Sequence, residues 1–377
     1  MRIAIDTRCL AGSRELKGVS QYTRHLTSGL LKRAGADVSF LLFPGFNHAR
    51  NRTVCGFFPD LLASARCIWS PVPMQIMERL WHFGWPPIEF ITGRIDVFFE
   101  PNFFLPPLGK ARSAVTVHDL SFYRHPEWFP EGVASGRVEK MGKTLRAADH
   151  VIAVSHFTAD EIKDVWPQHS GKISVIHEAA GPEFQPAGPD RLAELTGKYN
   201  LQDPFFLYTG TIEARKNVEK LISAFMYLRR SGGTKCQLIL AGSPGYGAET
   251  ILAAAAQGIE KGWIRVMGFL NQDDLPSMYS SAEGFCYLSR YEGFGLPPLE
   301  ALACGTPVLV SDIPVFREIL GPRGYFANPA NENEISEGLV RLEKTDRFTA
   351  DECIAWASQY SWERAASETF SVFRMIA

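Results

Sequence analysis

Short apolar runs alternate with longer amphipathic stretches along the chain. Each run is bounded by polar or turn residues, which is typical of strands buried within a parallel sheet. The runs are RIAID, DVSFLLF, DVFFE, SAVTVHD, HVIAVS and KISVIHE in the first half, and PFFLYTG, CQLILAG, IRVMGF, GFCYLS and TPVLVS in the second. Eleven strands of this kind predict an α/β protein.

Helical periodicity fills the stretches between the runs. Apolar side chains recur at helical spacing in two clear cases, Val19, Tyr22, Leu26 and Leu30, and Val218, Leu221, Phe225 and Leu228. Ser155 and Ser361 stand where a helix N-cap is expected, because each precedes a helical pattern. Strands interleaved with helices predict parallel sheets covered on both faces.

A proline-rich segment divides the chain. EAAGPEFQPAGPD, residues 178–190, contains three prolines and two glycines between two series of strands. The 377 residues exceed what one ordinary core organises. We therefore predict two doubly wound domains facing a cleft, residues 1–185 and 186–360, followed by a C-terminal helix at 361–377. Ligands of such sheets bind beyond the carboxyl ends of the strands.

Composition narrows the class of protein. The chain is 46% apolar and 21% charged with a net charge of −2. It lacks the excess of basic residues that would indicate a nucleic-acid partner. Seven scattered cysteines without a CxxC pair indicate buried thiols in a reducing compartment. The start MRIAIDTRCL does not resemble a signal peptide, and no apolar run reaches the roughly 18 residues of a membrane span. These features predict a cytoplasmic protein.

The richest chemistry lies in SRYEGFGLPPLEALACGTPVLVSD, residues 289–312. Glycines at 293 and 295 leave backbone amides free for phosphate oxygens, and the double proline that follows suits the start of a helix. The helix N-terminus favours an anion such as a diphosphate. Glu300 in this helix can then accept from a ribose diol, and Glu292 before the loop can reach a second sugar. The plainer alternative is a loop and helix carrying two solvated acids.

Five segments carry a resemblance to a known family. RYEGFGLPPLEALACGTPVLVSD resembles the donor-binding signature of glycosyltransferase family 4, whose members are retaining enzymes of GT-B fold. YTGTIEARKNVEKLI resembles its phosphate-contacting segment, and HVIAVSHFTADEI resembles the end of its first domain. TVHDLSFYRHPEWFP and KGVSQYTRHL are similar to a bacterial mannosyltransferase-like branch that builds surface polysaccharides. The resemblance implies two Rossmann-like domains, an N-terminal one for the acceptor and a C-terminal one for the nucleotide sugar, with the last helix crossing back to the first.

The resemblance also implies roles for single residues. The implied catalytic residues are His118, Arg215, Lys216 and Glu292. The implied donor-binding residues are Gly18, Thr211, Leu270, Phe294, Gly295, Leu296 and Glu300. Lys216 matches the lysine that holds the diphosphate, Glu292 the acid near the transferred sugar, and Glu300 the acid on the ribose. Thr211 stands where many members have an arginine, and Arg215 is the candidate for that missing charge.

The other matches are single positions. His118 matches a histidine placed against the donor sugar, and its neighbour Asp119 either orients it or caps the next turn. Gly18 matches a glycine whose backbone approaches the diphosphate, and Leu270 falls where members bind the base. Backbone contacts to the diphosphate and sugar are implied for Phe294, Gly295 and Leu296.

No metal ion or other cofactor is expected beyond the nucleotide-sugar co-substrate. The sequence contains no DxD motif, and QDDL at 272–275 is interpreted as the start of a helix. The resemblance implies metal-independent transfer with retention, in which a phosphate oxygen takes the proton of the acceptor hydroxyl.

The predicted activity is transfer of a hexose, α-mannose from GDP-mannose, to a saccharide acceptor in bacterial polysaccharide biosynthesis such as that of lipopolysaccharide. Free and polyprenyl-diphosphate-linked acceptors both remain open. Alternatives are a UDP-sugar-dependent glucosyl- or N-acetylhexosaminyltransferase, a nucleotide-sugar 2-epimerase, and a non-enzymatic sugar-binding protein.

A bulky stretch at residues 71–93, PVPMQIMERLWHFGWPPIEFITG, has two interpretations. Its methionines and tryptophans either pack on the first sheet or rest on a membrane surface beside a lipid-linked acceptor. The second interpretation would make the protein peripheral at the inner face of the cell membrane.

Overall fold

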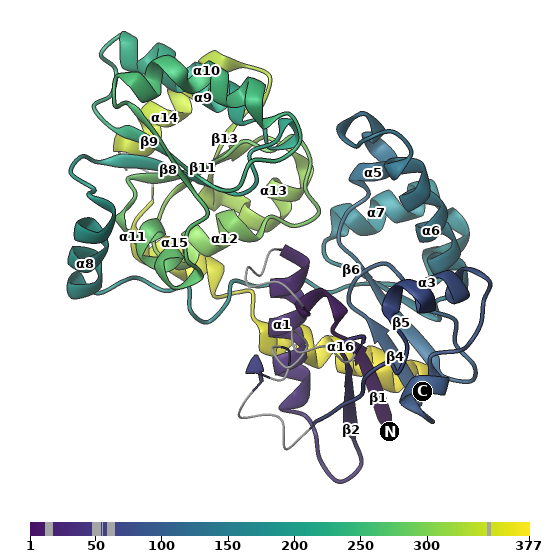
Figure 1. The fold of residues 1–377 in the computed structure, drawn as a ribbon. Helices are drawn as coiled ribbons and strands as arrows, with labels where there is room; N and C mark the ends of the chain where they lie inside the picture. Colours follow the sequence, from purple (N-terminus) through teal and green to yellow (C-terminus); the bar gives the residue numbers. More distant parts are fainter. Residues whose placement is uncertain (12–17, 47–53, 55, 59–64, 345–347) are drawn as a thin grey trace. The chain divides into compact units, whose positions relative to one another are not determined.

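The computed structural model describes residues 1–11, 18–46, 54, 56–58, 65–344 and 348–377. The chain forms two compact units (Figure 1). Unit 1 contains Met1–Pro126, Pro130–Glu178 and Ser361–Ala377, and unit 2 contains Glu127–Phe129 and Ala179–Tyr360.

Unit 1 is built on a seven-stranded parallel sheet with the order β3-β2-β1-β4-β5-β6-β7. The strands are β1 (Arg2–Asp6), β2 (Ser39–Phe43), β3 (Ala65–Cys67), β4 (Val97–Glu100), β5 (Arg112–Val117), β6 (His150–Ala153) and β7 (Ile173–Val175). The helices are α1 (Gly18–Leu31), α3 (Met74–His82), α4 (Glu89–Thr92), α5 (Ser121–Arg124), α6 (Val133–Ala147), α7 (His156–Val165) and α16 (Trp362–Ile376).

Side chains of β4 alternate between two layers of this unit, as a strand buried on both faces requires. Phe98 packs into a cluster with Met77 and Trp81 of α3. Phe99 points the other way and its ring lies 5.3 Å from that of Phe373 in α16. One strand therefore anchors helices on both faces of the sheet.

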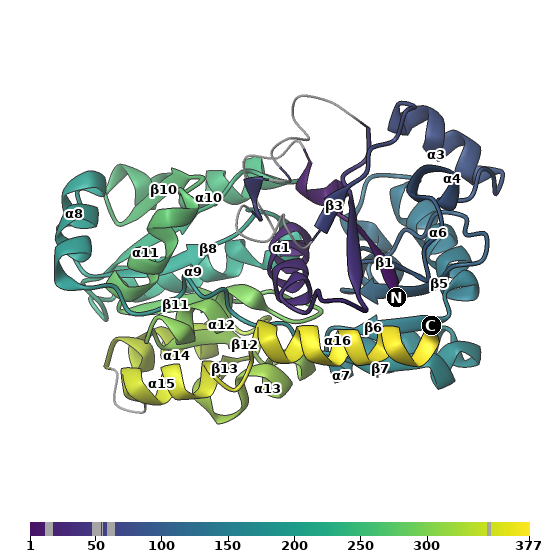
Figure 2. The ribbon, with the colours of Figure 1, turned by 90° about the horizontal axis from the view of Figure 1, so that it is seen from below.

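The last helix of the chain completes the first unit. Figure 2 shows α16 along unit 1, and it packs against α1. Gly29 of α1 sits so close to Ala366 that an added Cβ would lie 2.8 Å from the Cβ of Ala366. Ser361 caps α16 by accepting a hydrogen bond from the Arg364 amide at 3.1 Å. The C-terminal helix therefore belongs to the N-terminal unit, as the family resemblance implied.

Unit 2 is built on a six-stranded parallel sheet with the order β10-β9-β8-β11-β12-β13. The strands are β8 (Phe205–Thr209), β9 (Gln237–Ala241), β10 (Ile264–Gly268), β11 (Gly284–Tyr287), β12 (Val308–Ser311) and β13 (Gly324–Ala327). The helices are α8 (Pro189–Tyr199), α9 (Val218–Arg230), α10 (Ala248–Glu260), α11 (Leu275–Ser281), α12 (Leu296–Ala303), α13 (Pro314–Leu320), α14 (Glu332–Lys344) and α15 (Ala350–Ala357). Figure 1 shows α9, α10 and α14 on one face of this sheet and α11 and α12 on the other.

All eleven predicted strands are present, and the two doubly wound sheets of the predicted α/β fold are confirmed. The apolar pattern missed β3 and β13, the edge strand at one end of each sheet. These strands have only three and four residues, so their apolar runs are too short to stand out in the sequence. The six cysteines in the described ranges are free thiols. Among the helices in the described ranges, none has the length and apolar content needed to cross a membrane.

Candidate active site

The candidate site of unit 2 lies at the carboxyl ends of β8 and β11. These strands are neighbours in the sheet, so the loops that follow them run together. The first loop leads through Gly210 to a short 3-10 turn, Ala214–Lys216, and the second leads to α12. The Arg290 amide donates to the Arg215 carbonyl at 3.0 Å, which ties one loop to the other.

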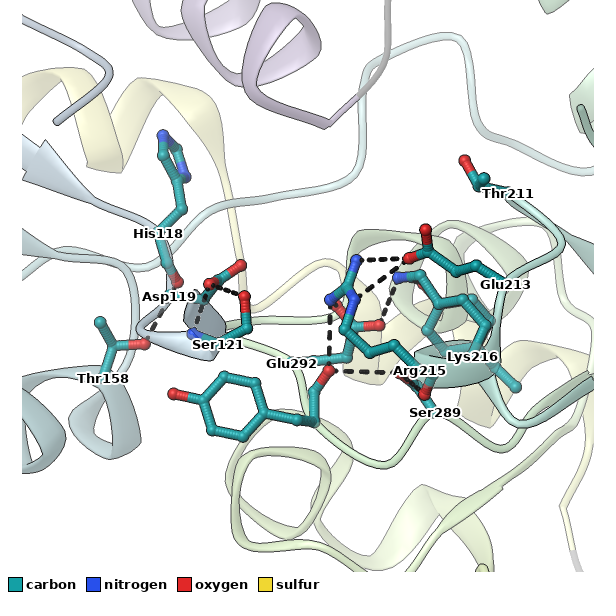
Figure 3. A network of polar contacts seen from close by, with 12 residues as sticks. His118, Asp119, Ser121, Thr158, Thr211, Glu213, Arg215, Lys216, Ser289 and Glu292 are labelled. Atoms are coloured by element: carbon teal, nitrogen blue, oxygen red, sulfur yellow. Dashed lines mark hydrogen bonds and ion pairs between the residues drawn. The ribbon is translucent and has the colours of Figure 1, made fainter. Parts of the chain in front are cut away.

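Lys216 and Glu292 form the centre of this site (Figure 3). Lys216 Nζ lies 2.5 Å from Glu292 Oε1. Only 10% of the lysine side chain and 12% of the glutamate side chain are exposed. Two opposite charges at such burial require one another, because an unpaired ion would be costly to keep away from water.

Arg215 adds a second cation beside the same carboxylate. Its guanidinium lies 3.5 Å from Glu292 Oε2 and 3.2 Å from Glu213 Oε1, and it donates to the Tyr291 carbonyl at 3.3 Å. Figure 3 shows its head group between the two glutamates. Arg215 and Lys216 therefore both contact the Glu292 carboxylate.

The charges around Glu292 fix its protonation state. Burial alone would raise the pKa of Glu292, but Lys216 and Arg215 outweigh burial and lower it to about 2. Burial and the charge of Arg215 lower the pKa of Lys216 from its ordinary value, while Glu292 works against them. At neutral pH Glu292 is a carboxylate with no proton to give, so it can bind and orient but cannot act as a general acid.

Tyr287 is a site residue that the sequence analysis missed. Lys216 Nζ donates to its hydroxyl oxygen at 2.6 Å and lies 5.0 Å from its ring centroid. Burial, reinforced by the charge of Glu292, raises the pKa of Tyr287 well above its ordinary value, so the phenol stays neutral. The sequence gives little indication of this role, because Tyr287 lies within the apolar run GFCYLS and resembles an ordinary strand residue.

Helix α12 begins where the double proline predicts a helix start. Gly295 is the N-cap of α12 with φ of 103°, a left-handed conformation that favours glycine. A Cβ there would lie 2.7 Å from Cε1 of Phe316, so a larger residue would also collide. Leu296 is the first helical residue, and Phe294 is buried edge-to-face against Tyr360. The side chain of Phe294 therefore fills the core, so the predicted ligand contact of this residue would have to come from its backbone.

Glu300 is positioned by a buried tyrosine. The Tyr279 hydroxyl donates to Glu300 Oε2 at 3.2 Å and is also bonded to Thr209 Oγ1 at 2.9 Å. Burial, with the charge of Glu300, raises the pKa of Tyr279 well above its ordinary value. Tyr279 lies in α11, and its tie to α12 was not visible in the sequence because it joins two helices that are separate in the pattern.

Thr211 is held through its backbone and Leu270 through its side chain. The Tyr208 hydroxyl donates to the Thr211 carbonyl at 2.8 Å. The loop of Thr211 also passes close to Gly242, where an added Cβ would lie 1.7 Å from the Gly210 carbonyl oxygen. Leu270 is buried with 4% exposure, so its side chain belongs to the core.

The acids of QDDL serve the fold, as predicted. Residues Gln272–Asp274 form a 3-10 turn that leads into α11. The Asp274 carboxylate accepts from Lys198 at 2.6 Å, from Tyr199 at 2.7 Å and from Arg191 at 2.8 Å. Those three donors commit Asp274 to holding α8 against the start of α11.

The predicted residues of unit 1 lie after β5 and at the start of α1. His118 follows β5, and its two ring nitrogens contact Glu178 and the Pro101 carbonyl. Asp119 Oδ1 accepts from the amide and the hydroxyl of Ser121, so this acid caps the turn and does not orient His118. Glu178 fills the orienting role instead. The sequence analysis missed it because it falls inside the proline-rich linker.

Gly18 opens α1 with φ of 27°, and nothing lies within 4 Å of where its Cβ would be. This open backbone is compatible with a closely approaching ligand.

Two family models match the chain in succession. The model described as Glycosyltransferase Family 4 matches residues 16–183, and the model described as Glycosyl transferases group 1 matches residues 196–357. The first match covers the strands of the unit 1 sheet except β1, and the second covers all the strands of the unit 2 sheet.

Two curated relatives from Escherichia coli are similar along much of the chain. The O-antigen chain mannosyltransferase B is 31% identical over 284 residues, which cover 74% of this chain and 74% of that protein. The serotype-specific mannosyltransferase WbdA is 30% identical over 395 aligned residues, covering 97% of this chain but only 47% of that protein. The chain thus corresponds to about half the length of WbdA.

Solved structures share the fold at lower identity. Sucrose-phosphate synthase from Thermosynechococcus elongatus superposes with a TM-score of 0.75 at 20% identity, covering 100% of this chain and 98% of that one. Anabaena HepE in complex with UDP-glucose gives a TM-score of 0.70 at 17% identity, covering 98% of this chain and 99% of that one.

Proposed function

This chain belongs to glycosyltransferase family 4, and we propose that it transfers an α-mannosyl residue from GDP-mannose to a saccharide acceptor with retention of configuration. It is a glycosyltransferase of GT-B fold. The observation that carries the proposal is the Arg215–Lys216 cation pair held beside the start of α12, with Glu292 and Glu300 on either side of Gly295 in the chain. The choice of mannose is supported by relatives named as mannosyltransferases.

Donor binding in unit 2 would begin with an exchange of ion-pair partners. A diphosphate offers oxygens that attract Arg215 and Lys216 more strongly than one carboxylate does. Once the phosphates share these cations, the Glu292 carboxylate is available to accept from hydroxyls of the transferred sugar. Glu300, held by Tyr279, accepts from the ribose diol. The amides at the start of α12 face the leaving diphosphate.

The chemical step is then electrostatic. The diphosphate gains negative charge as the glycosidic bond breaks, and the two cations stabilise that charge. The acceptor hydroxyl enters on the face that the diphosphate leaves and passes its proton to a phosphate oxygen. Glu292 remains a carboxylate throughout and holds the sugar in place.

Purified protein incubated with labelled GDP-mannose, UDP-glucose and UDP-N-acetylglucosamine, each with an oligosaccharide acceptor, tests the proposal. Transfer from GDP-mannose alone with an α-linked product supports it. Transfer from a UDP-sugar overturns the donor assignment, β-linked mannose overturns retention, and epimerised nucleotide sugar without transfer overturns the reaction class.

A lipid-linked acceptor at the membrane surface is part of the proposal. The 71–93 stretch is divided in the structure, since Met77 and Trp81 are buried whereas Phe83 and Trp85 are 83% and 62% exposed. Phe90 in α4 is 71% exposed. Exposed aromatic side chains are typical of surfaces that rest in a membrane interface.

Flotation with vesicles of phosphatidylglycerol and phosphatidylethanolamine tests this part. Wild type is expected to float with the vesicles, and a Phe83→Ser, Trp85→Ser double variant is expected to stay behind. Equal recovery of both proteins with the vesicles would contradict this role for the two aromatic residues.

A further inference from the structure

His118 is held at both ring nitrogens by oxygen atoms of unit 1. Its Nδ1 lies 3.0 Å from Glu178 Oε1, and its Nε2 lies 2.8 Å from the Pro101 carbonyl oxygen. The exposed fractions of the histidine and glutamate side chains are only 15% and 5%. Both contacts are short enough to be hydrogen bonds, and water reaches neither freely.

The chemistry of the two partners determines which atoms carry protons. A carbonyl oxygen can only accept, so His118 Nε2 must carry a hydrogen. An ionised carboxylate can also only accept, so Nδ1 must carry one as well. A carboxyl group ordinarily holds its proton less tightly than an imidazole, with pKa values of about 4.3 and about 6.5, so a shared proton belongs to the ring. A neutral ring would place a lone pair against one of the two oxygens and lose a buried hydrogen bond.

We propose that His118 functions as a fixed imidazolium cation and that Glu178 is the positioning residue that keeps it protonated and oriented. A ring of this kind cannot act as a general base. Both of its N–H groups already donate within unit 1, to Glu178 and to the Pro101 carbonyl. The ring therefore supplies positive charge, which attracts oxygens such as those of a phosphate or a sugar. The use of that charge on a nucleotide-sugar rests on the proposed function, whereas the protonation state does not.

The other groups around the ring agree with this assignment. The Tyr22 ring from α1 meets His118 edge-on at 4.7 Å, and its hydroxyl is bonded to Thr116. Burial raises the pKa of Tyr22 far above neutrality, so it brings no charge. Asp119, whose carboxylate is bonded to Ser121, adds a further negative charge nearby.

Two further observations complete the surroundings of the ring. Glu100, adjacent to Pro101, accepts from the Asn102 amide and lies 3.5 Å from Arg8, so its carboxyl group is committed elsewhere. Burial by itself lowers the pKa of His118, but the hydrogen bond and charge of Glu178 outweigh it, and the net effect is a raised pKa.

Nuclear magnetic resonance of the full chain, labelled with ¹⁵N in its nine histidines, tests the protonation state directly. The His118 signals are assigned by their loss in His118→Gln. In wild type at pH 7.5 both ring nitrogens should carry protons and have similar shifts. His150 provides an internal neutral reference, because burial and Lys172 lower its pKa. A neutral pattern for His118 in wild type at this pH would overturn the proposal.

Glu178→Gln separates the charge of Glu178 from its size. The amide oxygen still accepts from Nδ1, but the negative charge is gone, so the titration of His118 should move to lower pH. If the ring returns to an ordinary pKa of 6.5, roughly 3% remains protonated at pH 8. Glu161→Gln is the matched control, because Glu161 lies on α7 and pairs with Arg124 of α5. An unmoved His118 titration in Glu178→Gln would overturn the role of Glu178.

The activity profile distinguishes this inference from the proposed function. In wild type, kcat should be level from pH 6.5 to pH 8. In Glu178→Gln it should fall by up to about sixteenfold over the same range, because the protonated fraction of the ring drops from about half to about 3%. A level profile in Glu178→Gln, combined with a shifted His118 titration, would show that the charge is not used in catalysis. Absence of glycosyl transfer in wild type would contradict the proposed function alone, since the resonance result stands by itself.

Discussion

Lys216 Nζ lies 2.5 Å from Glu292 Oε1, although 76 residues separate the two in the chain. The adjacency of β8 and β11 in the sheet brings them together, because the loops after parallel neighbours emerge at the same edge. In the candidate donor site Glu292 is therefore the ion-pair partner of the cations, and we expect a bound diphosphate to take its place.

Lys216→Ala should lower kcat by about 10²- to 10³-fold, because one donor to the developing negative charge is lost. The protein should still fold, since Arg215 remains beside Glu292. The measurement is steady-state transfer at saturating donor, with circular dichroism to confirm folding. Lys220→Ala is the control, since that exposed lysine pairs with Glu332 and such surface pairs contribute about 0–1 kcal/mol. Unchanged turnover in Lys216→Ala would exclude the assigned role.

Glu300→Ala should weaken donor binding much more than it slows the chemical step. A hydrogen bond to a charged group contributes about 1.5–3 kcal/mol, so the KM for the nucleotide sugar should rise by about 10- to 150-fold while kcat changes little. Glu337→Ala on the exposed side of α14 is the comparison. A drop in kcat at constant KM would place Glu300 on the reacting sugar and not on the ribose.

Gly295→Ala should damage both stability and donor binding. The residue has φ of 103°, and a Cβ would lie 2.7 Å from Phe316, so strain and collision act together. We expect a loss of about 1–3 kcal/mol, measured by chemical denaturation. Gly197→Ala within α8 is the matched control, since nothing lies within 4 Å of its added Cβ. That variant should be equal to wild type or more stable by about 0.5–1 kcal/mol.

Acid should remove the contribution of Glu292 to stability. Its folded pKa of about 2 lies below the ordinary 4.5, so the stabilisation is fully present above pH 4.5 and is lost as pH falls through about 2. The full difference corresponds to about 3 kcal/mol. Urea denaturation from pH 7 to pH 3 should give wild type a larger free energy of unfolding than Glu292→Gln. The difference between the two free energies should narrow below pH 4.5. A margin that stays constant to pH 3 would mean that Glu292 keeps an ordinary pKa.

Nucleotides should stabilise the protein selectively. A ligand at a hundredfold its Kd adds about 2.7 kcal/mol, which raises the melting temperature measurably. GDP is expected to raise it more than UDP at equal concentration if the donor is GDP-mannose. A larger response to UDP would redirect the assay to UDP-glucose and related sugars. Lys216→Ala should reduce the response, because the diphosphate loses a cation.

The sequence by itself determined the fold class and most of the strands. A strand buried on both faces, such as GFCYLS or TPVLVS, must be apolar along its length, and that requirement is legible in one dimension. The helix start at the double proline after Gly295 was equally legible, whereas the left-handed conformation of Gly295 came from the structure. Strand burial and helix starts depend on a few neighbouring residues, so a short stretch of sequence is enough to predict them.

Only the tertiary structure decided which side chains of the candidate site are paired with one another. The sequence suggested Arg215, Lys216 and Glu292 as separate ligand contacts, whereas the fold joins them into one ion-paired cluster supported by Tyr287. It also assigned the orienting carboxylate of His118 to Glu178, 60 residues away, and gave the adjacent Asp119 to a turn. Sheet order and strand register set these distances, and side-chain pairing across strands follows from packing of the whole core, which no single segment records.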